Sequence, residues 1–180
     1  PYDPEGPNLI AVSEFLNIQN NIVFSTERLE FEQMNVLYNV ADFCMNISFA
    51  EGFGLSTLES MQAGTPIIAQ KTGGLTRQVV DHRDGSENGF ALDVEVKTLV
   101  GSQQVPYIYE DYVSSETVAN AIMKMYLLTD EEKSQLSEKV LSYVGSEFKY
   151  RDMIDKWDKT IWEKIHNWKD SYERYNTREI

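Results

Sequence analysis

Apolar residues recur along the chain with two alternating periods, one typical of helices and the other of buried strands. Helical spacing predicts helices over residues 8–18, 27–38, from about 54 to Gly64, and 76–80. Short apolar runs predict strands over residues 22–24, 43–47, 66–69 and 89–92. Strands that alternate with helices form right-handed βαβ units. The pattern therefore predicts an α/β fold with a parallel sheet.

The pattern changes after residue 92. Alternating apolar residues in the segment 93–114 predict a β-hairpin, and helical spacing returns from Ser115 onward. Within the last helical segment an apolar stripe runs through strongly charged sequence. Its members are Ile154, Trp157, Ile161, Ile165, Trp168 and Tyr172. Such a stripe packs either on its own domain or on another one.

Composition narrows the function classes. With 180 residues, 42% of them hydrophobic and 25% charged, the chain is long enough for one well-packed core. Sixteen Lys and Arg against 29 Asp and Glu give a net charge of −13, which disfavours nucleic acid and anionic membrane surfaces as partners. The single Cys44 cannot form an internal disulfide. There is no 18-residue apolar run and no metal-ligand spacing. We expect a cytoplasmic protein without a bound metal or an integral membrane segment.

The segment from Glu51 to Glu59 carries the candidate chemistry. Two carboxylates flank a turn with two glycines that leads into a helix. The first-turn N–H groups of a helix are unpaired and lie at the positive end of its dipole, so they suit phosphate oxygens. The carboxylates would repel phosphate and instead accept hydrogen bonds from sugar hydroxyls. Alternatively, Ser56 and Glu59 form a capping box that only begins the helix.

Several short motifs follow one another in a familiar order and spacing. They are Ala41-Asp42, Ser48-Phe-Ala-Glu51-Gly-Phe-Gly-Leu55, Leu58-Glu59-Ser-Met61, Ala63-Gly-Thr-Pro-Ile-Ile-Ala69, Gly73-Gly74-Leu75 and Val79-Val80-Asp81. In this order they resemble the carboxy-terminal domain of retaining GT-B glycosyltransferases, most nearly glycosyltransferase family 4, the glycosyl transferases group 1. The resemblance runs from about residue 21 to residue 90 and more loosely through the helices that follow.

The resemblance implies transfer of a hexose from a nucleotide diphosphate sugar to an unknown acceptor, with retention of configuration, in polysaccharide or glycoconjugate biosynthesis. Glu51 would lie against the donor hexose as the catalytic residue, and Glu59 would bind the ribose hydroxyls. The donor-binding residues would be Gly52, Phe53, Gly54, Leu55, Ser56, Thr57, Glu59, Gly73 and Gly74. No cofactor is implied, because the nucleotide sugar is a substrate.

The resemblance also implies a partial domain. We expect residues 1–150 to form a Rossmann-like, doubly wound nucleotide-sugar-binding domain that lacks its first strands, the carboxy-terminal half of a GT-B fold. Residues 151–180 would form an amphipathic helix that crosses to a missing amino-terminal domain, where a sugar, lipid or protein acceptor binds. The family's basic loops, which neutralise the donor diphosphate, lie in the missing part. The isolated chain is therefore expected to be an inactive fragment.

Two other function classes remain open. One is a non-catalytic, glycosyltransferase-like domain that scaffolds a partner, which the missing basic loops favour. The other is a sugar-nucleotide epimerase of GT-B shape, which the spacing of Glu51 and Glu59 disfavours. Arg77 could face a phosphate or form a salt bridge with one of the many acids. The hairpin residues Tyr107, Tyr109 and Tyr112 could stack on a sugar or pack against their own sheet.

Overall fold

The computed structural model describes residues 6–172, which divide into two units between residues 34 and 35. The first unit contains helix α1 (Leu9–Phe15) and the short 3₁₀ helix η1 (Gln19–Asn21). The side chain of Asn8 caps α1 by accepting a hydrogen bond from the N–H of Ala11. This confirms the helix predicted over residues 8–18 in a shorter form.

The strand predicted over residues 22–24 is wrong. Ile22 has extended dihedral angles, with φ −121° and ψ 132°, but residues 22–24 pair with no strand in the described part of the chain. The Val23 side chain is 97% exposed, so this apolar run is not buried either. An extended segment becomes a strand only where another strand takes up its backbone hydrogen bonds. Apolar composition alone was therefore an insufficient signal.

A three-stranded parallel sheet forms the centre of the second unit. Its strands β1 (Cys44–Asn46), β2 (Ile67–Gln70) and β3 (Gly89–Leu92) follow one another in chain order. Helix α2 (Phe31–Val40) precedes β1, α3 (Leu55–Gln62) joins β1 to β2, and α4 (Leu75–Val79) joins β2 to β3. Three of the four predicted strands and their connecting helices are thus confirmed.

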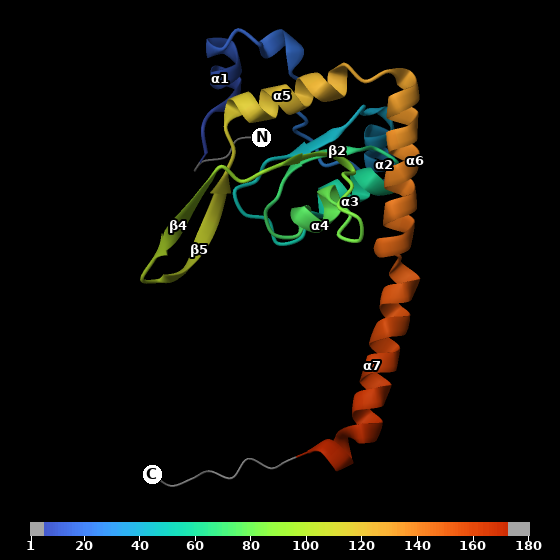
Figure 1. Cartoon of the computed structure of the whole chain (residues 1–180). Helices are drawn as coiled ribbons and strands as arrows, with labels where there is room; N and C mark the ends of the chain where they lie inside the picture. Colours follow the sequence, from blue (N-terminus) through green and yellow to red (C-terminus); the bar gives the residue numbers. More distant parts are fainter. Residues whose placement is uncertain (1–5, 173–180) are drawn as a thin grey trace. The chain divides into compact units, whose positions relative to one another are not determined.

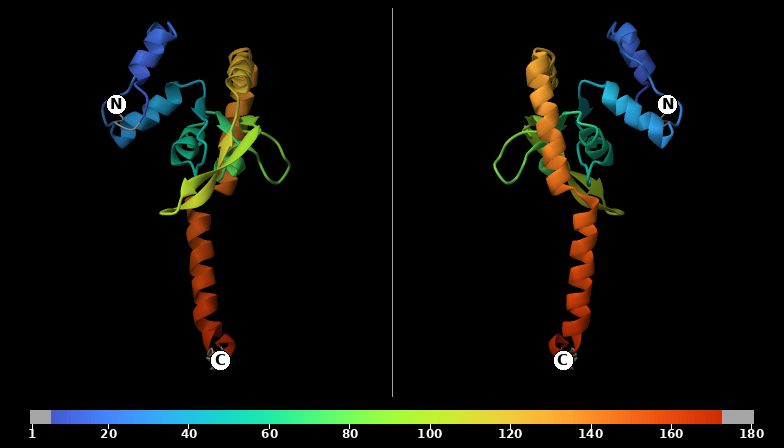
Figure 2. Two further views of the ribbon diagram at one scale, coloured as in Figure 1. Left: turned by 90° about the vertical axis from the view of Figure 1, so that its left-hand side faces the viewer. Right: turned by 90° about the vertical axis from the view of Figure 1, so that its right-hand side faces the viewer.

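Helices cover both faces of this sheet, with α3 and α4 on one side and α5 (Ser115–Tyr126) on the other (Figures 1 and 2). Successive residues of β2 point to opposite faces. Ile67 and Ala69 pack with α3, α4 and α6 (Asp130–Glu147), whereas Ile68 packs with Leu92 and with α5. All four residues of β2 are buried. The expected doubly wound arrangement is therefore present.

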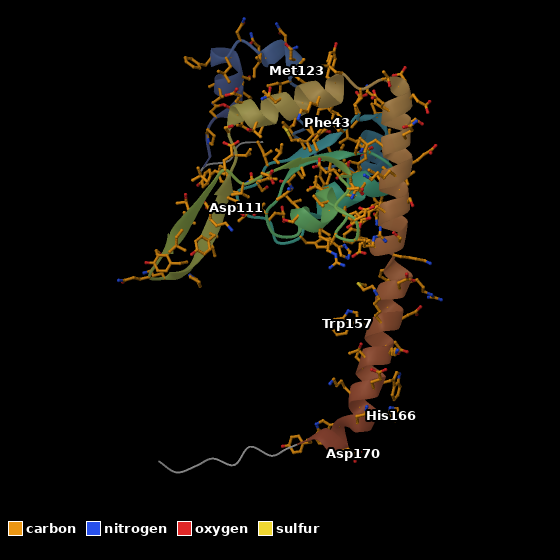
Figure 3. The ribbon with its side chains drawn as sticks, viewed as in Figure 1. Phe43, Asp111, Met123, Trp157, His166 and Asp170 are labelled. Carbon is orange, nitrogen blue, oxygen red and sulfur yellow. The ribbon has the colours of Figure 1, made fainter. Side chains whose placement is uncertain are left out.

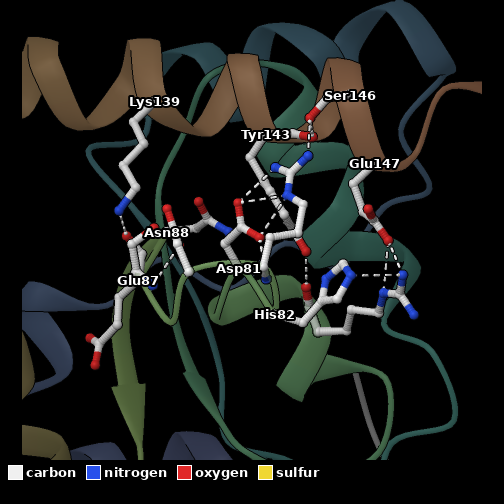
Figure 4. A network of polar contacts seen from close by, with 12 residues as sticks. Asp81, His82, Glu87, Asn88, Lys139, Tyr143, Ser146 and Glu147 are labelled. Carbon is white, nitrogen blue, oxygen red and sulfur yellow. Dashed lines mark hydrogen bonds and ion pairs between the residues drawn. The ribbon is translucent and has the colours of Figure 1, made fainter.

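A polar network fastens α6 to the connection between α4 and β3 (Figure 4). Arg83 clamps both carboxylate oxygens of Asp81, at 2.7 to 3.1 Å, and donates to the hydroxyl of Ser146 on α6. The Arg83 guanidinium also lies 5.2 Å from the ring centroid of Tyr143. Lys139 donates to the backbone oxygen of Glu87 at 2.6 Å. These polar contacts add to the apolar packing that holds α6 beside α3 and α4.

The predicted hairpin is confirmed as strands β4 (Val96–Ser102) and β5 (Val105–Tyr112), which pair in antiparallel orientation. The side chains of Tyr107 and Tyr109 are 62% and 61% exposed, so neither is buried against a sheet. Tyr112, at the base of the hairpin, is half-buried.

Helix α7 (Tyr150–Ser171) carries the apolar stripe of residues 154–172. All six side chains of this stripe are exposed, so among residues 6–172 nothing buries it. Packing of the whole stripe on this domain, one of the two expectations, is therefore wrong. Trp157 projects from the side of the helix (Figure 3). No helix between residues 6 and 172 combines the length and the apolar character that a membrane crossing needs.

Asp81→Asn should make the stability of the chain less sensitive to acid. The hydrogen bonds from Arg83 lower the pKa of Asp81 to about 2, whereas the pKa of an Asp side chain in an unfolded chain is about 4. A lowered folded-state pKa gives stability that is fully present above about pH 4 and is lost as pH falls toward 2. Denaturant titrations between pH 2 and 6 should show a shallower decline for Asp81→Asn than for wild type.

Asp93→Asn is the matched control, because Asp93 forms an exposed ion pair with Lys71 on the same domain. It should retain the wild-type dependence on pH. An Asp81→Asn variant whose unfolding free energy falls as steeply as that of wild type would contradict the assigned role of the pair.

Candidate functional site

The candidate site lies at the turn between β1 and α3, at the carboxyl end of the parallel sheet. Gly54 is the residue before the helix and adopts a left-handed conformation, with φ 87° and ψ 66°. Within residues 6–172 the backbone N–H groups of Leu55, Ser56 and Thr57 have no hydrogen-bond partner. The first intrahelical bond runs from the N–H of Leu58 to the oxygen of Gly54. Three donors are thus free at the positive end of α3.

The alternative interpretation, a capping box formed by Ser56 and Glu59, is wrong. The helix begins at Leu55, so Ser56 is its second residue, and no side chain caps it. Glu59 instead accepts a hydrogen bond from the Tyr38 hydroxyl at 3.1 Å. The box would need Ser56 as the N-cap, but left-handed Gly54 is the N-cap, two residues earlier, so Ser56 already lies within the helix. The chain does contain a capping box, formed by Thr129 and Glu132 at the start of α6.

A buried amide from α4 holds the turn in place. Gln78 donates from Nε2 to the backbone oxygens of Phe53 and Gly54, at 2.6 and 3.1 Å. The Thr57 hydroxyl lies 2.8 Å from the same Gly54 oxygen and 2.5 Å from Oε1 of Gln78. Gln78 and Thr57 are both fully buried. Of the predicted donor-binding residues, Thr57 therefore exposes no atom to a ligand in this structure, whereas Leu55 and Ser56 are exposed.

The second glycine motif packs directly on the first. A Cβ atom on Gly73 would lie 1.8 Å from the backbone oxygen of Glu51, and one on Gly74 would lie 2.5 Å from the Cα atom of Phe53. Gly73 also has a positive φ of 47°. The Gly74 N–H donates to the Glu51 oxygen over a long 3.4 Å. The structure therefore brings Glu51, Gly52 and Phe53 together with Gly73 and Gly74, which are about 20 residues away in sequence.

The two carboxylates have different surroundings. Glu51 is half-buried, and its Oε1 atom accepts a long hydrogen bond, 3.4 Å, from the N–H of Phe53. Glu59 is exposed on α3. Burial, together with the hydrogen bond to Glu59, raises the pKa of Tyr38 to about 12. The Tyr38 hydroxyl therefore keeps its proton at neutral pH and orients the Glu59 carboxylate.

The basic residues on either side of the Gly73-Gly74 loop are ion-paired. Lys71 contacts Asp93 at 2.6 Å, and Arg77 contacts Glu147 on α6. The salt bridge expected for Arg77 is therefore confirmed. The alternative, in which Arg77 faces a phosphate, is not favoured, because its guanidinium is already paired with Glu147. Between residues 6 and 172, no group of three His, Cys, Asp or Glu side chains is arranged to hold a metal ion.

A groove of about 780 Å³ opens on another side of α3. Phe53, Leu55 and Leu58 line it together with Phe148 and Trp157, and the ring of Phe148 meets that of Phe53 edge-on at 6.0 Å. Glu51 and Glu59 do not line this groove. Of the predicted site residues, only Phe53 and Leu55 reach it.

Sequence reasoning missed two residues that shape the site. The sequence offered a signal only for Gln78, which is a polar residue beside apolar neighbours in the predicted helix over 76–80. Such a residue is buried only if it is hydrogen-bonded. Tyr38 gave no signal, since its partner Glu59 lies 21 positions away on another helix.

Comparison with protein families finds one model, described as Glycosyl transferases group 1, that matches residues 3–101. A similar curated protein is the lipopolysaccharide 1,2-N-acetylglucosaminetransferase of Salmonella typhimurium, with 26% identity over 77% of this chain and 30% of that protein. The D-inositol 3-phosphate glycosyltransferase of Corynebacterium glutamicum is 36% identical over 50% of this chain and 22% of its own length. The chain thus spans less than a third of these relatives.

Solved structures support the fold. Sucrose-phosphate synthase from Thermosynechococcus elongatus superposes with a TM-score of 0.69 and 20% identity, over 91% of this chain and 37% of that one. The carboxy-terminal domain of a group 1 glycosyl transferase from Francisella tularensis superposes with a TM-score of 0.57 and 20% identity, over 79% and 61% of the two chains. The expected fold, part of the carboxy-terminal half of a GT-B fold, is confirmed.

Gly73→Ala should destabilise the chain by about 2 kcal/mol or more, because a Cβ atom there meets backbone and the residue has a left-handed conformation. Gly52→Ala is the control, since a Cβ atom on Gly52 has no neighbour within 4 Å. Urea unfolding of both variants measures the difference. Equal stabilities would show that the two loops do not pack as described.

Proposed function

Because this chain belongs to the glycosyl transferases group 1 family, we propose that it binds a nucleotide diphosphate sugar within an enzyme that transfers a hexose with retention of configuration. The observation that carries this proposal is the turn between β1 and α3. There, the unpaired N–H groups of exposed Leu55 and Ser56, the half-buried Glu51 and the Gly73-Gly74 loop lie together at the carboxyl end of a parallel sheet. Open α/β sheets bind their ligands at this end.

The main chain would receive the diphosphate. The N–H groups of the exposed residues Leu55 and Ser56 are preorganised by the hydrogen bonds from Gln78 to the turn, so they need no rearrangement when a phosphate oxygen arrives. Gly52, where a Cβ atom would meet nothing within 4 Å, would allow the donor to approach the backbone closely. Phe53, Gly54, Gly73 and Gly74 would shape the same side of the donor site, since a Cβ atom on each of these three glycines would meet other protein atoms. Exposed Glu59, oriented by Tyr38, would accept hydrogen bonds from the ribose hydroxyls.

The transfer itself needs no general base from the protein. The bond between the anomeric carbon and the diphosphate oxygen breaks, and a bond to the acceptor oxygen forms on the same face of the sugar. The proton of the acceptor hydroxyl passes to the departing phosphate. Glu51 would orient the hexose and add negative potential beside the oxocarbenium-like carbon, while the helix amides stabilise the charge on the leaving diphosphate. The proposal includes no metal and no cofactor.

The acceptor would be bound by another domain. We propose that α7 lays its apolar stripe across an amino-terminal domain that holds a sugar, lipid or protein acceptor. Support comes from the exposure of all six stripe residues and from the small share of the relatives that this chain spans. Residues 151–172 would then belong to the interface between the domains, whereas the rest of the predicted segment 151–180 lies outside the described residues. We place the enzyme in the cytoplasm, where nucleotide sugars would serve polysaccharide or glycoconjugate synthesis.

A non-catalytic scaffold is a second candidate, because both basic residues flanking the Gly73-Gly74 loop are already ion-paired. A diphosphate bound here would find no uncommitted cation from Lys71 or Arg77. For the same reason we propose that the isolated chain binds donors weakly and is inactive. Calorimetry of the natural full-length protein with uridine, guanosine and adenosine diphosphates separates the candidates, since a scaffold would give no saturable heat.

Glu51→Gln in the natural full-length protein should lower the turnover number by about two orders of magnitude, as loss of a preorganised electrostatic group does. The Michaelis constant for the donor should change far less, because the amides of α3 remain in place. Transfer of labelled sugar from uridine and guanosine diphosphate sugars provides the measurement. Glu138→Gln, on the exposed surface of α6, is the control. Undiminished turnover in Glu51→Gln would remove Glu51 from the mechanism.

A further inference from the structure

The hairpin β4–β5 is joined to the loop that carries Glu51. The N–H of Asp111 on β5 donates to the backbone oxygen of Phe49 at 2.7 Å. The neighbouring Tyr112 stacks on Phe49, with ring centroids 4.4 Å apart and planes inclined by 31°. Asp111 lies near the base of the hairpin (Figure 3) and is 93% buried, since only 7% of it is exposed. Two independent contacts thus converge on one residue, two positions before Glu51.

The loop between β1 and α3 has few other anchors. After Phe49, the next backbone oxygen held by another element is that of Glu51, over 3.4 Å to the N–H of Gly74. That distance lies outside the usual range for a hydrogen bond of this kind. The oxygen of Phe53 follows, held by Gln78 at 2.6 Å. Glu51 therefore lies between two firm anchors, the hairpin on one side and Gln78 on the other.

The base of the hairpin is itself well fixed. The N–H of Glu95 donates to the oxygen of Tyr112 at 2.9 Å. The Glu95 carboxylate accepts hydrogen bonds from the hydroxyls of Ser114 and Thr117, at 3.0 and 2.5 Å, at the start of α5. Since α5 packs on the sheet through the core around Ile68 and Leu92, the base moves with the sheet.

We propose that the hairpin is a positioning element of the site, in which Tyr112 and the Asp111 amide fix Phe49 and thereby hold the Glu51 carboxylate in place. Tyr112 is a positioning residue, because it acts through Phe49 and not on the substrate. A loop held at only one end would leave Glu51 less precisely placed, and a misplacement of about 1 Å is enough to weaken catalysis strongly. The role of Glu51 in this inference rests on the proposed function; the fixing of the loop does not.

Hydrogen exchange of the natural full-length protein tests the loop directly, without any ligand. Tyr112→Ala should speed exchange of the Asp111 amide, which donates to the Phe49 oxygen, by about tenfold, while amides of β2 keep their protection. Tyr112→Phe retains the stacked ring and loses only the hydroxyl that donates to Glu110, so it should behave as wild type. Tyr107→Ala is the matched control, because Tyr107 is an exposed tyrosine on the same strand.

Unchanged exchange of the Asp111 amide in Tyr112→Ala would overturn the proposal. So would faster exchange in Tyr107→Ala equal to that in Tyr112→Ala, because the effect would then come from the hairpin as a whole. Faster exchange across β2 as well would also overturn it, since Tyr112 would then support the entire fold.

Kinetics connect the loop to catalysis. With a uridine or guanosine diphosphate sugar that the wild type uses, Tyr112→Ala should lower the turnover number about tenfold or more and change the donor Michaelis constant little. Tyr112→Phe should restore turnover. A wild-type protein that uses neither donor and binds no nucleoside diphosphate would end the proposed function, yet the exchange result would stand. A Tyr112→Ala variant with wild-type turnover would overturn only the proposed coupling between Tyr112 and Glu51.

Discussion

The hydrogen bonds from Gln78 to the backbone oxygens of Phe53 and Gly54 are the constraint on which the site depends. Without them the carbonyl of Phe53 would have no partner in the described part of the chain, whereas that of Gly54 would still accept from the Leu58 N–H and the Thr57 hydroxyl. With them, α3 begins at Leu55 and its first three N–H groups stay free. Gln78 belongs to α4, so the start of one helix is set by the interior of the next.

The need for Gln78 to reach this turn explains why residues 73 and 74 are glycines. Gly73 and Gly74 precede α4, and they must allow its first turn to approach Glu51 and Phe53 closely enough for Gln78 to reach the turn. A side chain on either glycine would push the two loops apart. The motif around Glu51 and the Gly73-Gly74 motif therefore form one packing unit, although nearly two dozen residues separate them. The apolar contacts of α4 with β2 hold this unit on the sheet.

Sequence reasoning succeeded where the signal was local. The strands at 43–47, 66–69 and 89–92 were predicted from short apolar runs between turns, and the hairpin from its alternation. It failed at residues 22–24, because a strand depends on a partner that a local pattern does not contain. It also failed at Ser56, because the left-handed Gly54 moved the helix start. Most of the fold was thus predictable, whereas the contacts of Tyr38 and Gln78 within the site were not.

The net charge of −13 would oppose diphosphate binding only if all charges of the chain acted at long range. Screening in physiological salt limits that range to about 8 Å, so the groups near the turn decide the local potential. Several acids of this domain are neutralised by partners: Asp93 by Lys71, Glu147 by Arg77 and Asp81 by Arg83. Within residues 6–172, Glu51 and Glu59 form no ion pair, so the exposed amide donors at the start of α3 supply the local attraction for an anion. Because those donors are neutral groups in fixed positions, their attraction to an anion survives in a protein that repels polyanions as a whole.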